Sequence, residues 1–251
     1  MAAVVRLKGF VMHTVDVQPL PPAIVTALQH VCTATLTTVL LKKGLRNVWM
    51  RGTRPLAPGQ GRRIGRAFTL RFVPAREDLA TPASWGSPVS TRAAIEAMPP
   101  GVIAVVGAMG VTDAGIFGDI LFARMARREV AGLVTDGVVR DVPGVLASRL
   151  PVWCQGTAAP PSVAGLTFVG WQEPVGCGGV AVFPNDVVVA DDDGAVLIPA
   201  ALLDAVVDEA VEQERLEAWI MQEVQAGAEL PGLYPPNEAN RARYEAWKRG
   251  G

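Results

Sequence analysis

The sequence predicts an α/β domain built in layers, with βα units in the middle of the chain and a strand-rich section after them. Val102–Val106 and Ala131–Thr135 are short, continuous apolar runs, which are typical of strands buried on both faces. The segment between them, Gly118–Arg128, has the length and pattern of a helix. Beyond residue 160, short apolar runs alternate with Gly, Pro, Asn and Asp, a pattern typical of strands joined by turns.

The first part of the chain predicts an irregular start, two helices, a loop and a strand. In that order, we expect them at residues 1–20, Ile24–Val31, Leu36–Lys43, Arg51–Gly65 and Ala67–Val73. Thr33 and Thr35 offer hydroxyl groups that can cap the first N–H groups of the second helix. Gly44 follows that helix and is suited to the left-handed backbone that ends many helices.

The rest of the chain predicts three βα units, four short strands and a long helix. The helices are expected at Thr91–Ala97, Gly118–Arg128 and Val142–Ser148, and the strands between and after them at Val102–Val106, Ala131–Thr135 and Val152–Cys154. The later strands are expected at Leu166–Val169, Gly179–Val182, Val187–Ala190 and Ala195–Ile198, before a helix over Ala201–Gln225 that Gly227 ends. We therefore predict one domain over residues 1–228 and a Pro-containing arm over 229–251, with a short charged helix at Glu238–Arg249.

The charge composition disfavours nucleic-acid binding as a function and favours an oligomer. The chain has 251 residues, 50% of them hydrophobic, and a formal net charge of −1. A nucleic-acid-binding surface needs clustered positive charge, and Arg62-Arg63 with Arg66, the nearest approach to a cluster, is expected to be a solvated turn. We therefore expect no nucleic-acid partner. The low charged fraction of 19% indicates a surface partly buried in an oligomer.

Cysteine usage and hydropathy bear on the compartment. The three cysteines, Cys32, Cys154 and Cys177, are widely spaced and odd in number, so neither a disulfide framework nor a metal knuckle is expected. The start of the sequence has no apolar stretch typical of a secretory signal, and runs such as Val102–Val106 are too short to span a bilayer. We expect a cytoplasmic protein without a membrane partner.

The sequence lacks the residues or motifs that several common types of catalytic or binding site need. The two histidines, His13 and His30, lie in the N-terminal fifth of the chain, so a Ser-His-Asp site or a His-rich zinc site is not expected. None of the four lysines falls on a central strand, which disfavours Schiff-base chemistry. The sequence also contains neither a GxGxxG after a strand nor a GxxxxGK[ST], so dinucleotide and P-loop sites are not expected.

Carboxylates and one arginine remain as candidates for chemistry. Asp119 opens a predicted helix directly after Gly118, where backbone N–H groups attract anions. Arg140 and Asp141 follow the predicted strand Ala131–Thr135, and sites in α/β folds collect at the carboxyl ends of strands. Arginine can bind a carboxylate with two hydrogen bonds, and a carboxylate can hold Mg²⁺ or Mn²⁺. The simpler alternative is a surface ion pair and a helix-capping acid.

These residues resemble a known family. Gly118-Asp119-Ile120-Leu121, followed by Val134-Thr135-Asp136-Gly137-Val138-Val139-Arg140-Asp141, is similar to the signature of class II pyruvate aldolases of the 4-hydroxy-4-methyl-2-oxoglutarate aldolase type. That family shares its fold with the regulator of ribonuclease activity A. The spacing of 21 residues from Asp119 to Arg140 (140 − 119) matches its pattern. The resemblance extends from Thr33 to Gly227 and includes Pro184–Asp191.

The resemblance implies a fold and a set of roles. The fold is a swivelling β/β/α domain, like the phosphohistidine domain, here with a C-terminal helical extension, and it assembles into homotrimers or homohexamers. Asp141 is expected to ligate Mg²⁺ (or Mn²⁺) directly, and Asp119 through a water. Arg140 is expected to contact the C2 oxygen of a small 2-oxo acid, whose carboxylate would bind backbone N–H groups of Gly118, Asp119, Ile120 and Leu121. The family also places an acid of the neighbouring subunit at the metal through water; Glu217 matches best, and Glu214 less well.

The implied activity is a metal-dependent lyase that cleaves 4-hydroxy-2-oxo acids to pyruvate, with oxaloacetate decarboxylation as a side activity. Two features depart from the family: Val142-Pro143-Gly144-Val145 lacks the acid that often follows the Arg-Asp pair, and the tail after residue 228 is longer. One alternative is a non-catalytic regulator that binds ribonuclease E or helicases, although such regulators are shorter and lack the acid that Asp141 supplies. The other is an isomerase or hydrolase of sugar-derived 2-oxo acids.

Overall fold

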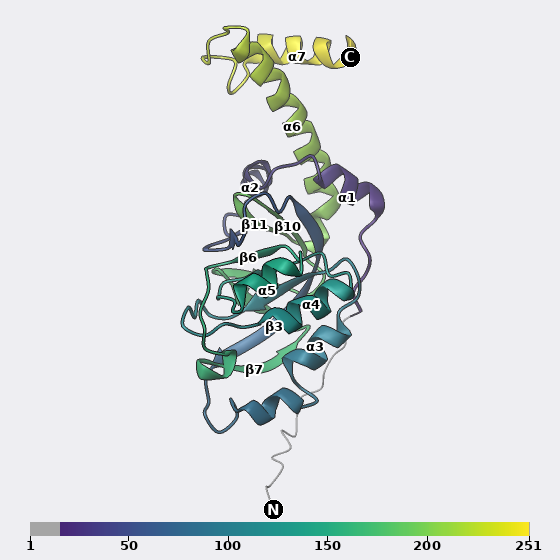
Figure 1. Cartoon of the computed structure of the whole chain (residues 1–251). Helices are drawn as coiled ribbons and strands as arrows, with labels where there is room; N and C mark the ends of the chain where they lie inside the picture. The colour runs from purple at the N-terminus through teal and green to yellow at the C-terminus, as the bar shows by residue number, and fades with distance from the viewer. Residues whose placement is uncertain (1–15, 251) are drawn as a thin grey trace, which may run out of the picture.

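The computed structural model describes residues 16–250 as a strongly curled β-sheet with helices against it and a long helix that leaves the body at one end (Figure 1). Nine strands form this sheet. Eight of them follow one another in the order β1 (Trp49–Met50), β11 (Gly194–Ile198), β10 (Val187–Asp191), β3 (Arg63–Pro74), β4 (Ile103–Gly107), β5 (Gly132–Thr135), β6 (Val152–Cys154) and β2 (Arg54–Pro55). The ninth, β7 (Leu166–Trp171), pairs with β3.

The long strand β3 joins the two halves of the sheet. Its first residues pair antiparallel with β10, and its later residues pair parallel with β4. The pairs β4–β5 and β5–β6 are also parallel. Three short helices cross between these parallel strands: α3 (Thr91–Ala97), α4 (Asp119–Arg127) and α5 (Val142–Ala147). The chain therefore contains consecutive βαβ units, as the alternation of apolar runs predicts.

Three apolar clusters fill the layers. One lies between the sheet and α3, α4 and α5, and contains Phe117, Phe122 and Met125. A second lies inside the curl, where a separate hairpin, β8 (Val175–Cys177) and β9 (Val180–Val182), packs on the sheet. The third packs β10 and β11 against α1 (Pro22–Leu28), α2 (Thr33–Lys42) and α6 (Leu203–Gln225). The predicted α/β class with a C-terminal helix is confirmed.

Most predicted elements are present with boundaries moved by a few residues. The helix Thr91–Ala97 and the strand Val152–Cys154 are found with the predicted bounds. The segment predicted as a loop over 51–65 instead contains β2 and the start of β3. Strands β1 and β8 were not predicted. Of the irregular start predicted for residues 1–20, residues 1–15 lie outside the described part of the chain.

Two local predictions are wrong for identifiable reasons. The N-cap of α2 is Cys32 rather than a threonine, because its Sγ accepts a hydrogen bond from the backbone N–H of Thr35. Arg62 and Arg66 do not lie in a solvated turn. Arg62 directly precedes β3 and pairs with Asp191 at 3.4 Å, and Arg66 lies on β3 and donates to the carbonyl of Asn185. Strand pairing across the sheet therefore recruits these arginines for internal contacts.

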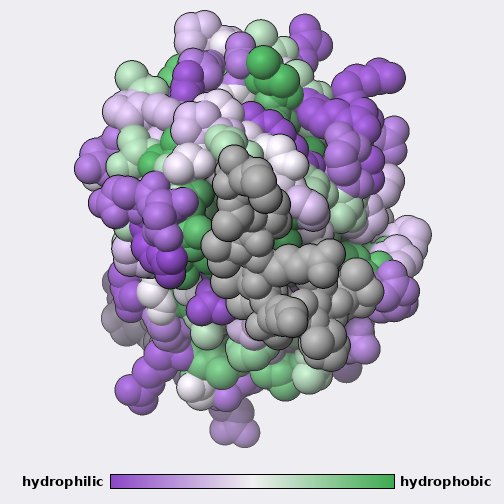
Figure 2. All heavy atoms as spheres, turned by 90° about the horizontal axis from the view of Figure 1, so that it is seen from below, coloured by the Kyte–Doolittle hydropathy of each residue, from purple (hydrophilic) through white to green (hydrophobic). Residues whose placement is uncertain are grey.

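Polar and apolar side chains are distributed unevenly over the surface. The end of the body opposite the long helix carries mostly polar side chains around its margin, with apolar ones between them (Figure 2). Large exposed apolar side chains are frequent on α6 and beyond it: Met221, Val224, Leu230, Tyr234 and Trp247. No single helix within residues 16–250 is long and apolar enough to cross a membrane, although α1 and α2 pass that test of length and composition as a sharply bent pair.

The far end of α6 carries a small core of its own. Trp219, Ile220 and Leu233 are buried there with Tyr244 of α7 (Glu238–Gly250), and the rings of Trp219 and Tyr244 lie 5.7 Å apart. Glu212 of α6 accepts hydrogen bonds from the Tyr244 hydroxyl at 2.9 Å and from Lys248 Nζ at 2.8 Å. A single acid therefore links α7 to α6 in two places.

We expect docking of α7 on α6 to depend on pH in both directions. Lys248, and then the Tyr244 hydroxyl, lower the pKa of Glu212, so this contact stabilises the arm above about pH 4 and is lost as the pH falls through the lowered value. Burial and Glu212 raise the pKa of Tyr244 to about 12, so the stabilisation from this group is complete below about pH 10 and is lost as the pH rises toward 12. Tryptophan fluorescence across a pH titration measures both transitions.

Glu212→Gln is the matched variant for this titration. Because the amide does not titrate, the variant is expected to lose the acid transition of the arm while the body unfolds at its usual pH. An acid transition of equal size in the variant would contradict the assignment to Glu212.

Candidate functional site

Three loops meet at the carboxyl ends of β4, β5 and β6 and are held together by backbone hydrogen bonds. Two hydrogen bonds join the loop after β4 to the loop after β5. The N–H of Ile116 donates to the carbonyl of Val138 at 2.9 Å, and the N–H of Arg140 donates to the carbonyl of Phe117 at 3.0 Å. The loop after β6 joins through Val139 N and the Gly156 carbonyl at 3.1 Å. Because each loop is bonded to its neighbour, the side chains they carry have defined positions.

Helix α4 begins at this junction. Gly118 is its N-cap residue and has an extended backbone, and no side chain caps the helix. Asp119 is the first residue of α4, and its carboxylate is packed against Gly144 of α5: a Cβ built on Gly144 would lie 2.8 Å from Asp119 Oδ2. The absence of a side chain at residue 144 therefore makes room for Asp119.

Asp141 mirrors this arrangement at the start of α5. It is the N-cap residue of α5 and has left-handed backbone angles, with φ at 57° and ψ at 45°. Such a conformation is uncommon for residues with a side chain and is better tolerated by Asp. Its Oδ2 lies 3.1 Å from Nε of Arg140. A Cβ built on Gly118 would collide with the same Oδ2 and lie 3.3 Å from Cγ, so the carboxylate fills the space that glycine leaves.

Each carboxylate thus rests against the glycine of the other helix start. The structure brings together Gly118, Asp119, Arg140 and Asp141, as the sequence predicts. The side chains of Arg140 and Asp141 are 33% and 41% exposed, which leaves room for a ligand beside them. Ile120 is 79% exposed.

The side chains at this junction suit an open site for a divalent cation better than a closed one. Within residues 16–250, no three His, Cys, Asp or Glu side chains are grouped closely enough to enclose an ion. Mg²⁺ and Mn²⁺ prefer oxygen ligands, and Mg²⁺ retains several waters when one or two carboxylates hold it. Two partly exposed carboxylates beside an arginine fit that requirement, whereas a closed zinc site would need four protein ligands.

The acids proposed for the neighbouring subunit lie elsewhere in this chain. Glu217 and Glu214 are on α6, which packs on α1 and α2. Glu214 accepts a hydrogen bond from the backbone N–H of Cys32 at 2.8 Å, and Glu217 accepts one from Gln213 at 2.7 Å. Glu214 is thus already used to hold the start of α2, which leaves Glu217 as the better candidate. Its role in a second subunit stays a prediction.

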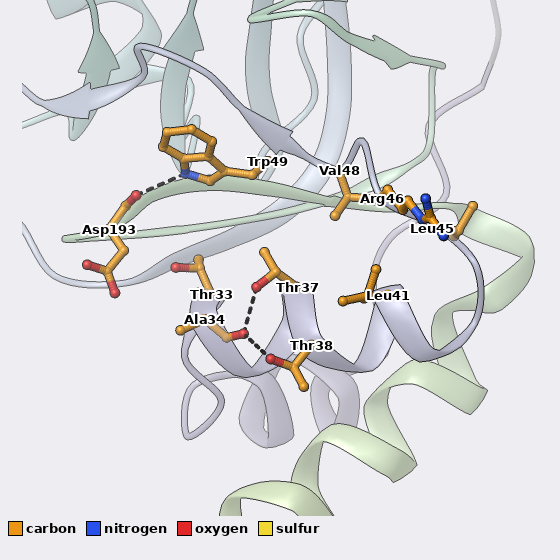
Figure 3. Close-up of a pocket in the computed structure, with 10 residues that line it drawn as sticks. All are labelled: Thr33, Ala34, Thr37, Thr38, Leu41, Leu45, Arg46, Val48, Trp49 and Asp193. Atoms are coloured by element: carbon orange, nitrogen blue, oxygen red, sulfur yellow. Dashed lines mark hydrogen bonds between the residues drawn. The ribbon is translucent and has the colours of Figure 1, made fainter.

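A groove on the surface lies apart from these loops. It has a volume of about 460 Å³ and is lined by Thr33, Ala34, Thr37, Thr38, Leu41, Leu45, Arg46, Val48, Trp49 and Asp193 (Figure 3). The hydroxyls of Thr37 and Thr38 already donate to the Ala34 carbonyl, and the Trp49 indole donates to the carbonyl of Asp193. These hydroxyl and indole groups are therefore already used in contacts within the chain.

The sequence analysis assigns no function to two residues near the site, Asp136 and Gln155. Asp136 is buried and accepts a hydrogen bond from the backbone N–H of Ala108 at 2.7 Å. Gln155 donates from its side chain to the carbonyl of Asp136 at 2.7 Å. Asp136-Gly137 is visible in the sequence as a turn dipeptide, but its partners lie in other loops and carry no local signal.

Comparisons with known proteins agree with the resemblance seen in the sequence. The sequence profile of the family described as "RraA-like: Aldolase/RraA" matches residues 30–197. The crystal structure of RraAS2 from Streptomyces coelicolor, described as an unusual member of the RNase ES inhibitor RraA protein family, is 36% identical with a TM-score of 0.73. That alignment covers 81% of this chain and 98% of RraAS2. An uncharacterized protein from Pseudomonas syringae pv. tomato has the same TM-score at 25% identity, over 86% of this chain and 99% of that one.

Sequence relatives with enzyme names match over shorter stretches. A protein of Halalkalibacterium halodurans named "Putative 4-hydroxy-4-methyl-2-oxoglutarate aldolase" is 36% identical over 101 residues, which is 40% of this chain and 47% of that protein. Protein DlpA of Legionella pneumophila is 28% identical over 177 residues, which is 70% of this chain and 28% of DlpA. The chain thus spans less than half the length of either relative.

Proposed function

The chain belongs to the RraA-like family, which is described as Aldolase/RraA, and from that premise we propose that it is a divalent-metal-dependent lyase that cleaves 4-hydroxy-2-oxo acids to pyruvate. The observation that carries the proposal is that Asp119 and Asp141 each pack against a glycine at the start of the other's helix, with Arg140 bonded to Asp141. Two carboxylates supply oxygen ligands for Mg²⁺ or Mn²⁺. The arginine supplies a fixed positive charge for an anionic substrate.

Each residue has a distinct proposed task. Asp141 would hold the cation directly, and Asp119 would hold it through a water. The N–H groups at the start of α4, across Gly118–Leu121, would bind the substrate carboxylate, since a helix N-terminus favours an anion; the N–H of Ile120, which donates to Asp119 Oδ1 at 2.7 Å, would then change partner. Arg140 would donate to the C2 oxygen. A bound divalent cation supplies Lewis acidity at the 2-oxo group.

The reaction then needs charge stabilisation and a proton transfer. Asp119 would orient the water that removes the proton from the C4 hydroxyl, as general base catalysis requires. As the C3–C4 bond breaks, its electron pair becomes the enolate of pyruvate, and negative charge develops on the C2 oxygen. Arg140 stabilises that charge through a charge-assisted hydrogen bond. Loss of carbon dioxide from oxaloacetate produces the same enolate, which accounts for the proposed side activity.

The competing function is regulation of a ribonuclease. It is favoured by RraAS2, whose description places it in a family of RNase ES inhibitors and which is 36% identical over most of this chain. A protein that only binds a partner has no need for Asp141 in a left-handed conformation beside Arg140. The two functions therefore differ in whether activity requires the carboxylates of Asp119 and Asp141.

The direct test is pyruvate release from 4-hydroxy-4-methyl-2-oxoglutarate and from oxaloacetate, with Mg²⁺ and with EDTA. We expect release that depends on the metal with both substrates. No release from either substrate, together with no Mg²⁺ binding by calorimetry, would exclude the lyase and favour the regulator.

Replacement of Arg140 by lysine is expected to lower kcat by about 10- to 100-fold, because lysine keeps the charge but loses the planar fork that reaches both Asp141 and the C2 oxygen. Mg²⁺ binding is expected to change little, since Asp141 is retained. Steady-state kinetics and calorimetry check the two expectations. An Arg140→Lys enzyme with unchanged kcat would remove Arg140 from the reaction.

We also propose a homo-oligomer, a trimer or hexamer, because within one chain Glu217 lies on α6 rather than beside Asp119. Light scattering measures the mass in solution. Glu217→Gln is expected to reduce kcat without changing that mass.

A further inference from the structure

Asp136 is a buried acid in the loop that leads to Arg140 and Asp141. It follows β5 directly, and its side chain is almost fully enclosed, with the residue 6% exposed. Within residues 16–250, it forms no ion pair with a lysine or arginine. A buried carboxylate without a cationic partner is costly unless hydrogen bonds replace the lost water.

Backbone N–H groups from two other loops supply those hydrogen bonds. Oδ1 accepts from Ala108 N at 2.7 Å, and the N–H groups of Gly110 and Gly178 also stabilise the charged form. Ala108 and Gly110 begin the loop that ends at Gly118 and Asp119. Gly178 lies in the turn between β8 and β9, and its carbonyl accepts a hydrogen bond from the N–H of Arg51. One carboxylate therefore connects three segments that are far apart in the sequence.

The connection lies at the base of both halves of the site. Gly137 packs so closely on the loop after β4 that a Cβ there would lie 2.7 Å from Ala108 Cβ. Further along, Gly115 forms a β-bridge with Val138, and a Cβ built on it would lie 2.8 Å from Arg140 Cβ. A change in the spacing of the two loops at Asp136 would therefore be carried to Asp119 on one side and to Asp141 on the other.

We propose that Asp136 is a positioning residue, which sets the separation of the two loops that present Asp119 and the Arg140-Asp141 pair. This inference rests on the proposed lyase function for its catalytic consequence, but the connection between the loops can be measured without activity. Asp136 itself is not expected to touch the substrate, because the backbone encloses its carboxylate.

The chain offers a matched control in Asp186. This acid is similarly buried, at 7% exposed, and its carboxylate also accepts from backbone N–H groups, of Phe183 at 2.9 Å and Ala200 at 3.0 Å. It directly precedes β10, outside the three loops of the site. Asparagine at either position keeps the shape but turns an N–H donor toward other N–H donors, which lowers the stability of the fold. The two variants should therefore be destabilised alike.

The experiment compares Asp136→Asn with Asp186→Asn in the full chain by thermal unfolding, amide hydrogen exchange, Mg²⁺ calorimetry and steady-state kinetics. For Asp136→Asn we expect faster exchange of the amides at 108–118 and 137–141, about 10-fold weaker Mg²⁺ binding and a kcat lower by about 10- to 100-fold. For Asp186→Asn we expect a similar loss of thermal stability, faster exchange near residues 183–200, and unchanged kcat.

Different failures are distinguishable. Equal kcat values and unchanged exchange at 108–118 in the Asp136→Asn variant would overturn the positioning role. If the wild type lacks metal-dependent turnover, the proposed function fails, while faster exchange in both site loops of the variant would still support Asp136 as the residue that couples them.

Discussion

Replacement of Asp141 by alanine is expected to abolish Mg²⁺ binding and to lower the rate of pyruvate release by about 10³-fold or more, since several kcal/mol of transition-state stabilisation would be lost with the cation. The residue is exposed enough that its removal leaves no cavity in the core. Its backbone occupies the left-handed region, where alanine is less favourable than aspartate, so a small loss of stability is also expected. Calorimetry and kinetics on the folded variant measure the effect.

Asp113→Ala provides the control for that measurement. Asp113 is an exposed carboxylate on the loop after β4 and lies outside the Asp119–Asp141 pair. We expect its removal to leave Mg²⁺ affinity and kcat unchanged. Metal-dependent turnover that survives in Asp141→Ala would contradict the assignment of the direct ligand.

Gly118→Ala is expected to approach the same loss of activity, about 10³-fold, without removing a polar group. The added methyl would occupy the position of Asp141 Oδ2, so the carboxylate has to rotate away. The backbone at Gly118 has φ at −114°, a conformation that alanine adopts freely. Because the colliding atom is the end of a side chain on the surface, we expect the fold to survive and the metal ligand to be displaced.

Gly86→Ala is the matched substitution for this test. A Cβ at Gly86 would meet nothing within 4 Å, so thermal stability, Mg²⁺ binding and turnover should all match the wild type. Normal Mg²⁺ affinity in Gly118→Ala would mean that Asp141 does not hold the ion in the position that the structure gives its carboxylate. Circular dichroism establishes that both variants are folded before affinity is compared.

The sequence predicts the central fold well because the signals there are local. Continuous apolar runs mark β4 and β5, whose residues are completely buried. The turn residues after residue 160 correctly separate β7, β9, β10 and β11. In contrast, β1 has two residues and β8 has three, and each is defined by the strand it pairs with. Pairing between distant segments leaves no periodic pattern in so short a run.

The residues of the candidate site that have a local signal can be predicted from the sequence, whereas their tertiary contacts cannot. Gly118, Asp119, Arg140 and Asp141 stand next to predicted helix starts and strand ends, so their meeting follows from the rule that parallel strands end at one edge. The close approach of Asp119 to Gly144 depends on the packing of α4 on α5. The capping of α2 by the Cys32 thiol and the contact of Arg62 with Asp191 likewise depend on tertiary neighbours. Propensities along the chain do not contain this information.

The most direct test of the central claim is the exchange of the methyl protons of pyruvate with solvent deuterium, followed by proton NMR. Exchange requires the enolate of pyruvate and does not depend on knowing the second product of the natural substrate. We predict that the wild type with Mg²⁺ will remove the methyl signal well above the rate without protein, and that EDTA or Asp141→Ala will stop the exchange. An absence of exchange in the wild type at saturating Mg²⁺ would contradict the proposal that this site forms a pyruvate enolate.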